Sequence, residues 1–186
     1  MDPDEIMFNT EEGMEKAVGY LTHEFASVRT GKASPALVEG IEVEAYGSKM
    51  KLKQLAIISA PEPRLLVINP FDASTTQAIE KAIKESNIGI QPSVDGKIIR
   101  LPIPALSEER RRDLVKTVKH ITEETRVRIR AARRDGMDGL KKAQKEGDLT
   151  EDELAKLEKE VQKLTDDYVK KVDDNSAAKE ADIMKV

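Results

Sequence analysis

The distribution of proline divides this chain more sharply than any other feature of its sequence. Seven of the eight prolines lie between residues 32 and 105, and only Pro3 lies outside that segment. Proline lacks a backbone N–H and its ring clashes with the preceding helical turn, so helix interiors exclude it. Residues 1–31 and 106–186 can therefore form long helices, whereas residues 32–105 cannot.

The two flanking segments carry apolar residues with helical periodicity. Charged residues make up 49 of their 112 positions, against 17 of 74 in the central segment. Apolar side chains recur every three or four positions, which places them on one face of a charged helix. Because no single stripe can bury itself, three of them predict a three-helix bundle. The stripes run over Met14–Val28, Leu114–Ala143 and Leu154–Val172.

Capping and breaking residues indicate where these helices begin and weaken. Thr150 and Glu153 have the spacing of a capping box, which predicts the start of the last helix. Whether that helix continues past residues 175–178 stays open. Gly136 and Gly139 are the expected weak points of the middle helix, since each costs about 1 kcal/mol relative to alanine.

The central segment has the pattern of a small α/β domain. Short alternating or apolar runs bounded by turn residues are typical of strands. The expected elements are a hairpin over residues 41–55 with its turn at 47–48, a strand at 65–68, a helix at 72–86 and a strand at 98–101. Residues 32–105 are thus predicted to form a domain inserted into a helical domain of residues 1–31 and 106–186.

The chain crosses between the two predicted domains near residues 30–35 and again near 102–106. Both crossings contain glycine or proline, which interrupt regular structure. Two short connections side by side limit twist but allow swing, so we expect a hinge. The alternative, two ordinary loops at a rigid interface, stays open. The hinge residues are Gly31, Lys32, Ser34, Pro35, Pro102, Pro104, Ala105 and Leu106.

Several classes of enzyme and metal site are excluded by what the sequence lacks. Without cysteine there is no disulfide scaffold, thiol nucleophile or thiolate metal site. His23 and His120 have no partner at metal-ligand spacing, and no glycine-rich phosphate loop is present. Adjacent carboxylates point about 100° apart on a helix and do not converge. We therefore predict no catalytic residue, no metal, no cofactor and no enzymatic activity.

The charge and hydropathy of the chain bear on its location. The formal net charge is −4, which argues against a globally basic nucleic-acid binder. No apolar run approaches the roughly 20 residues that a membrane span needs. The acidic N-terminus is typical of neither a signal peptide nor a transit peptide. We expect a soluble, cytoplasmic monomer that does not bind membranes.

The middle predicted helix carries a local run of positive charge. Arg126, Arg130 and Arg133 recur at i, i+4 and i+7 and therefore share one face. A guanidinium group stays charged and donates two parallel hydrogen bonds to phosphate. Aromatic residues make up only 3% of the chain, so recognition of the RNA backbone and shape is expected rather than base stacking. The run from 126 to 134 contains Arg126, Arg128, Arg130, Arg133 and Arg134, with no acidic residue among them.

Two other interpretations of this run stay open. The arginines could form a solvated face, or they could pair with acidic residues of a neighbouring helix. A separate alternative for the function is a helical adaptor that binds protein partners through its charged helix faces. Glu123 already interrupts the basic face, which otherwise extends backward to Lys119, Lys116 and Arg112.

Several short motifs occur in an order that resembles a known family. They are Arg29–Pro35, Val43–Gly47, Leu52–Ala56, Asn69–Asp72, Glu80–Ile83, Glu108–Arg111, Arg133–Asp135 and Val161–Asp166. Together they resemble the ribosome recycling factor family over essentially the whole chain. The resemblance implies an α+β fold, with an elongated three-helix bundle and a small inserted β-rich α/β domain in an L shape.

The resemblance also implies a function and a set of residues. Members of this family enter the vacated tRNA region of the post-termination ribosome and bind large-subunit rRNA. Elongation factor G with GTP then separates the subunits, and mRNA and tRNA are released. The family's functional arginines fall on Arg111, Arg130 and Arg133, with Arg29 near the hinge. Ala131 and Met137 stand where the family commonly has asparagine, and no role is assigned to either.

Overall fold

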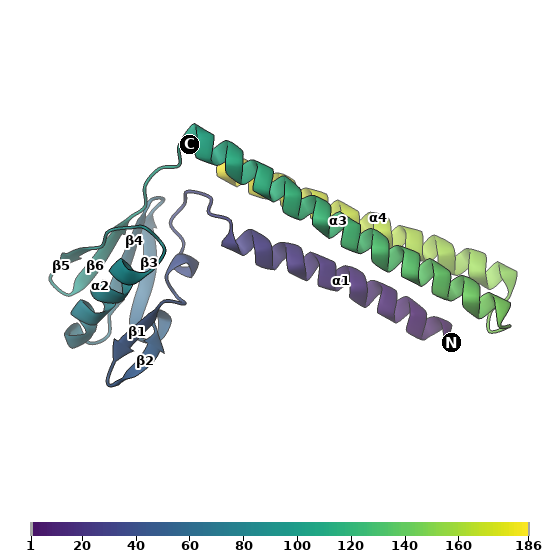
Figure 1. Cartoon of the computed structure of the whole chain (residues 1–186), viewed down its shortest axis with the longest axis horizontal. Coiled ribbons are helices and arrows are strands. Elements are labelled where there is room, and N and C mark those ends of the chain that lie inside the picture. The colour runs from purple at the N-terminus through teal and green to yellow at the C-terminus, as the bar shows by residue number, and fades with distance from the viewer. Residues whose placement is uncertain (1, 186) are drawn as a thin grey trace. The chain divides into compact units, whose positions relative to one another are not determined.

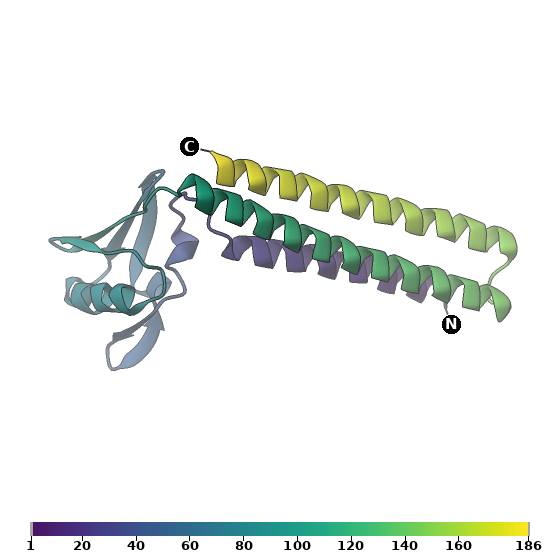
Figure 2. The same cartoon turned by 45° about the horizontal axis from the view of Figure 1, so that its top comes forward.

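Three long helices form one of two compact units in the computed structural model, which describes residues 2–185. This helical unit combines the chain up to Thr30 with the chain from Glu108 onward, and the sheet unit spans Gly31–Ser107. The helices of the first unit lie side by side, each antiparallel to the next along the chain (Figure 1, Figure 2). They are α1 (Pro3–Ser27), α3 (Glu108–Lys145) and α4 (Glu151–Met184).

The predicted apolar stripes form the core of the helical unit. Met14 and Leu21 of α1 are fully buried, as are Ile129 of α3 and Val172 of α4. Buried threonines interrupt this core without leaving a hydroxyl unpaired. Thr10, Thr122, Thr125 and Thr165 each donate to the carbonyl oxygen four residues earlier, at 2.7–2.9 Å. This local bond satisfies the hydroxyl inside its own helix.

Helix α4 continues through the polar residues where the sequence left its end open. Ser176 is buried, and its hydroxyl is hydrogen-bonded to that of Thr122, with the two oxygens 2.9 Å apart. Ile183, two turns later, is fully buried. Packing against α3 therefore carries the helix to Met184. Its start is the predicted capping box, in which Thr150 and Glu153 exchange side-chain to backbone bonds at 3.1 and 2.8 Å.

Gly136 and Gly139 of α3 lie where this helix packs against α1. The helix runs unbroken through both of them over 38 residues. A Cβ on Gly136 would overlap the hydroxyl oxygen of Thr10 and lie 2.9 Å from its Cγ2. A Cβ on Gly139 would lie 3.2 Å from Ile6 Cγ2. Both glycines thus mark positions where α3 approaches α1 closely, rather than weak points.

The sheet unit contains two antiparallel sheets and one α-helix. In the larger sheet the strand order is β3-β4-β6-β5, and α2 (Thr76–Glu85) lies against it (Figure 1). Leu66 and Ile68 of the sheet share one core with Ile79 and Ile83 of α2. The strands are β1 (Glu42–Ala45), β2 (Ser48–Lys51), β3 (Ala56–Glu62), β4 (Leu65–Pro70), β5 (Ser93–Asp95) and β6 (Ile98–Pro102).

The hairpin turn lies one residue earlier than the sequence predicts. Tyr46 and Gly47 occupy it, with φ angles of 53° and 76°. Two consecutive left-handed residues are what a tight two-residue hairpin needs to match the twist of its strands. Tyr46 is the only non-glycine residue with positive φ in the described chain, and its hydroxyl donates to Asp72 at 2.8 Å.

Both segments that link the two units are tied to the same turn of the sheet unit. The Ala33 N–H donates to the Pro63 carbonyl at 2.7 Å, and the Ile103 N–H donates to the Arg64 carbonyl at 2.8 Å. Pro63 and Arg64 form the turn between β3 and β4. Beyond these two anchors, Gly31 has a φ of 79° and its Cα faces the side chain of Leu106, which a Cβ there would approach to 3.2 Å.

Candidate nucleic-acid interface

The arginine face of α3, defined as Arg126, Arg130 and Arg133, borders α4. Arg133 donates from Nε to the Gln162 side chain of α4 at 2.8 Å. Arg126 donates to Asp173 of α4 from Nη2 at 2.6 Å and from Nε at 3.1 Å. Two of the three arginines are therefore held in place by the neighbouring helix.

Arg130 lies between these two along the helix, and its side chain is more exposed than that of Arg126. Its side chain is 59% exposed, and both of its terminal nitrogens lie 3.2 Å from one oxygen of Glu123. Glu123 also accepts a bond from Arg126 at 3.3 Å. The hydrogen bond from Arg126, followed by the positive charge of Arg130, lowers the pKa of Glu123. The carboxylate of Glu123 is thus ionised and shared by two arginines.

One interpretation from the sequence, pairing with acidic residues of a neighbouring helix, is realised at Arg126. Its guanidinium is held between Asp173 and Glu123, and its side chain is only 33% exposed. The hydrogen bond that Arg126 donates to Asp173 is the largest cause that raises the pKa of Arg126. The guanidinium group of Arg126 is therefore engaged by two carboxylates inside the helical unit.

The other two arginines of the run differ in their surroundings. Arg134 is exposed and has no partner among residues 2–185. Arg128 stands over the ring of Tyr20 in α1, with its guanidinium carbon 4.0 Å from the ring centre. Tyr20 donates in turn to Glu124 at 2.7 Å. Arg128 therefore stabilises the contact between α1 and α3, whereas Arg134 is free to bind an external ligand.

Arg29 and Arg111 lie apart from the arginine face, at one end of the helical unit. Arg29 follows the end of α1 and Arg111 lies in the first turn of the antiparallel α3. Both side chains are half-buried. The Nε and Nη2 atoms of Arg29 and the Nε atom of Arg111 are buried without a hydrogen-bond partner in the described part of the chain. A buried donor without a partner is costly, so these atoms are unsatisfied donors in the free chain.

Sequence reasoning missed the residues that position these arginines. Asp173 and Gln162 come from α4, and nothing in a single sequence gives the rotation of one helix against another. Glu123 had a signal, because it precedes Arg126 by three residues and Arg130 by seven. The first of these spacings is that of a helical ion pair.

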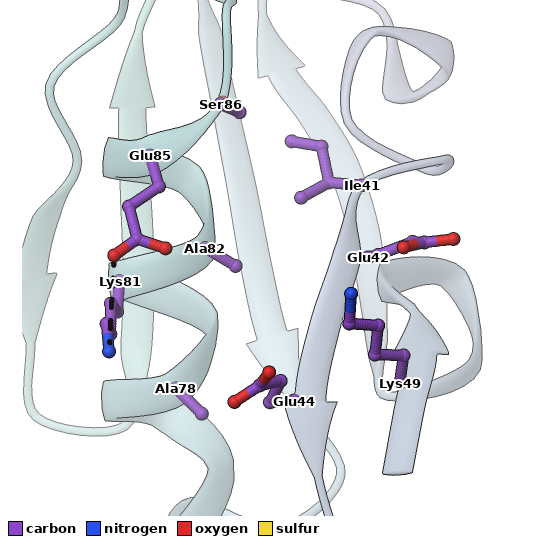
Figure 3. A pocket seen from close by; sticks show the side chains of 9 residues that line it. All are labelled: Ile41, Glu42, Glu44, Lys49, Ala78, Lys81, Ala82, Glu85 and Ser86. Atoms are coloured by element: carbon purple, nitrogen blue, oxygen red, sulfur yellow. Dashed lines mark ion pairs between the residues drawn. The ribbon is translucent and has the colours of Figure 1, made fainter.

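The sheet unit has a groove of its own, with a volume of about 690 Å³, between β1 and α2 (Figure 3). Ala78 lines its floor, and Lys81 and Glu85 of α2 form an ion pair at 4.0 Å. The one hydroxyl among the lining residues, that of Ser86, donates to the Ile83 carbonyl at 2.6 Å. No activated nucleophile therefore faces this groove.

The described part of the chain has neither a cluster of metal ligands nor a helix suited to a membrane. Within residues 2–185, no three His, Cys, Asp or Glu side chains gather closely enough to hold a metal ion. None of the helices in that range is both long enough and apolar enough to cross a membrane.

Comparison with known families decides the assignment. The family model described as ribosome recycling factor matches residues 21–184, which include Arg29, Arg111 and the whole arginine face. The chain belongs to the ribosome recycling factor family. This confirms the family recognised from the sequence motifs.

Relatives in the ribosome recycling factor family match this chain over its full length. The ribosome-recycling factor of Akkermansia muciniphila is 55% identical over an alignment that covers all of both chains. That of Rubrobacter xylanophilus is 50% identical, with 96% of each chain covered. The name of the family links the chain to ribosome recycling, a stage of translation.

Solved structures of the same family support the fold. A solution structure of the ribosome recycling factor has a TM-score of 0.80 and 43% identity, and the match covers 100% of this chain and 99% of that one. A second structure matches with a TM-score of 0.68 and 43% identity over the full length of both chains. Its title describes models of the Thermus thermophilus ribosome recycling factor and the Escherichia coli elongation factor G bound to the post-termination complex. The predicted α+β class, with long helices and a small antiparallel sheet unit, is confirmed.

Proposed function

We propose that this chain recycles ribosomes after termination. It binds the post-termination ribosome in the region that tRNA has vacated. With elongation factor G and GTP it separates the subunits, and mRNA and tRNA are released. The observation that carries this proposal is the full-length match to ribosome recycling factors, one of which was described together with elongation factor G on the post-termination complex.

The arginines of the helical unit supply the contacts to large-subunit rRNA in this proposal. Arg130, Arg133 and Arg134 present guanidinium groups along about one turn of α3. Arg29 and Arg111 offer buried donors that lack a partner among residues 2–185. Phosphate oxygens are strong acceptors with the geometry that guanidinium groups match. Arg126 contributes indirectly, by holding Glu123 and Asp173 beside Arg130.

The helical unit acts as a stiff element on which force can be transmitted. Helix α3 has 38 residues and is about 57 Å long at 1.5 Å per residue. Close packing of α1 at Gly136 and burial along α4 brace it on two sides. A rod of this kind transmits a push along its length instead of bending.

The segments that link the two units serve as the hinge. The hydrogen bonds of Ala33 and Ile103 to the β3–β4 turn limit which residues of these segments can move. Ala33 and Ile103 are bonded to the β3–β4 turn, so movement is concentrated between these residues and the helices. Of the residues assigned from the sequence, Gly31, Lys32, Pro104, Ala105 and Leu106 lie in these two stretches, and Ser34, Pro35 and Pro102 lie on the sheet-unit side of the anchors.

The chain itself catalyses no reaction in this proposal. Elongation factor G hydrolyses GTP and supplies the force, and the recycling factor receives it as a monomer in the cytoplasm. The arrangement needs only a grip on rRNA, a stiff helical unit and a second unit that moves.

Binding of wild-type and variant chains to 70S ribosomes at increasing salt tests the arginine contacts. Each lost phosphate contact should reduce the slope of log affinity against log salt by about one unit. We expect Arg130→Ala and Arg133→Ala to weaken binding with this reduced slope. Lys141→Ala is the matched control, because Lys141 is an exposed cation on the same helix with no partner in the described residues.

Thermal unfolding of each variant establishes that it is folded. If Arg130→Ala and Arg133→Ala both bind ribosomes like the Lys141→Ala control at every salt concentration, the arginine face is not the rRNA contact.

A further inference from the structure

The carboxylate of Glu123 occupies the place on the arginine face where a phosphate would bind. One of its oxygens lies 3.2 Å from both terminal nitrogens of Arg130, the fork that would hold a phosphate. Its other oxygen lies 3.3 Å from Arg126. With Asp173 at 2.6 Å from Arg126, two arginines and two carboxylates form a cluster without net charge.

Stability of the helix does not explain this arrangement. The side chains of Arg130 and Glu123 are 59% and 53% exposed, and exposed ion pairs add little to stability. The pair also spans seven residues, whereas a helix gains from pairs three or four residues apart. The consequence of the pair is instead that each terminal nitrogen of Arg130 already donates one N–H to Glu123 in the free protein.

The cluster can exchange Glu123 for an external phosphate without leaving a charge unpaired. When Arg130 turns to a phosphate, Glu123 keeps its contact with Arg126, and Arg126 keeps both of its contacts with Asp173. Release of Arg130 from Glu123 therefore leaves each of the other three charged groups with an ion-pair partner. A carboxylate on the same helix competes at a high effective concentration, as any tethered ligand does.

We propose that Glu123 is an internal competitor for Arg130 that limits how tightly the chain holds RNA. This inference rests on the proposed function, because it takes the ligand of Arg130 to be an RNA phosphate. A recycling factor must leave the large subunit after each round. Competition from the Glu123 carboxylate lowers the affinity for RNA and so favours dissociation. Glu123 is in this sense an affinity-setting residue, and it contacts the arginines rather than the RNA.

The variant Glu123→Gln tests the competitor, since it keeps the shape of the side chain and removes its charge. Two probes are used, the 70S ribosome and a short RNA duplex. One phosphate contact contributes a slope of about −0.9 in log affinity against log salt, which is about eightfold between 1 M and 0.1 M salt. We expect Glu123→Gln to bind both probes about fivefold to tenfold more tightly at 0.1 M salt, with a slope steeper by about 0.9 and slower dissociation from the ribosome.

Two controls separate this effect from a change of net charge. Glu124→Gln removes the same charge at the adjacent position, whose carboxylate accepts from Tyr20 and lies 3.3 Å from His120. It should leave the slope unchanged. In an Arg130→Ala background, Glu123→Gln should lose most of its gain, because the donor that it frees is absent.

The outcomes distinguish this inference from the function on which it rests. If the wild-type chain fails to bind ribosomes, the proposed function is wrong, and the duplex still reports on the competitor. If the wild type binds ribosomes but Glu123→Gln binds equally or less tightly, Glu123 does not compete with RNA and the inference is overturned. A gain that Glu124→Gln reproduces would overturn it as well, since net charge alone would then explain the result.

Discussion

Replacing Gly136 by alanine should destabilise the helical unit, although alanine is the better helix former. An added Cβ would overlap the Thr10 hydroxyl oxygen and lie 2.9 Å from Cγ2 and 3.2 Å from Cβ of the same residue. Rotation of Thr10 about its Cα–Cβ bond moves the hydroxyl and Cγ2 away from the added atom but leaves the Thr10 Cβ 3.2 Å from it. It would also break the 2.7 Å bond from the Thr10 hydroxyl to the Ile6 carbonyl.

The expected change in the free energy of unfolding is the sum of one stabilising and two destabilising contributions. Alanine in place of glycine gains about 1 kcal/mol of helix propensity. Overpacking a tight contact costs about 1–3 kcal/mol. Loss of the Thr10 hydrogen bond costs about 1 kcal/mol more. We therefore expect Gly136→Ala to lower the free energy of unfolding by about 1–3 kcal/mol.

Urea unfolding followed by circular dichroism at the helical signal measures this change. Gly19→Ala is the matched control, because Gly19 lies in α1 and a Cβ there would meet nothing within 4 Å. That variant should gain up to about 1 kcal/mol. The two variants make the same chemical change, so the difference between them isolates the close approach of α3 to α1.

The double variant Thr10→Ala/Gly136→Ala tests whether the overlap with the Thr10 side chain causes the loss of stability. Thr10→Ala removes the hydroxyl and Cγ2 and leaves only the Cβ, so Gly136→Ala should cost much less in that background. The coupling free energy between the two sites should be about 1–3 kcal/mol. If Gly136→Ala is as stable as Gly19→Ala in the otherwise wild-type chain, the contact is not as close as the structure has it and the reasoning is refuted.

Three further predictions concern a titration, a helix cap and the hinge. Burial, followed by the nearby carboxylate of Glu15, raises the pKa of Tyr168 to about 12, so its contribution to stability is complete below pH 10 and is lost as the pH rises from 10 to 12. Tyr168→Phe should therefore lose less stability over that range than the wild type in urea unfolding, and an equal loss would contradict the pKa. Thr150→Ala removes the hydroxyl that accepts from the Glu153 N–H and should lower the free energy of unfolding by about 1 kcal/mol, whereas an unchanged urea midpoint would count against the cap. Ala105→Pro stiffens one of the hinge stretches and should slow subunit separation more than it weakens ribosome binding, and equal loss of both would argue for misfolding or for a rigid role of the hinge.

The helices could be predicted because their signals are local. Met14, Leu21 and Ile129 belong to stripes that the sequence shows directly, and all three are fully buried. The capping box of Thr150 and Glu153 spans only four residues, so no knowledge of tertiary structure is needed to find it. The central segment could be recognised as non-helical in the same way, because the exclusion of proline from helix interiors is also a local effect.

The features that the sequence did not reveal depend on contacts between distant segments. Strand β5 has all three residues exposed and lies at a sheet edge, so it lacks the alternation by which strands are recognised. The need for glycine at position 136 comes from its contact with Thr10, which lies 126 residues away in the sequence. The pairing of Arg126 with Asp173 depends on the rotation of α4 against α3. The charge run in the sequence therefore shows where the arginines lie on α3, but not which of their donors are already hydrogen-bonded within the chain.

The most direct test of the account is the fate of post-termination 70S ribosomes on a sucrose gradient. The ribosomes are incubated with this chain, with elongation factor G and GTP, and with each component omitted in turn. We expect separated subunits only when the chain, elongation factor G and GTP are all present, and Arg130→Ala should reduce the fraction separated. Ribosomes that stay intact with all three components, or that separate equally well without the chain, would contradict the proposed function.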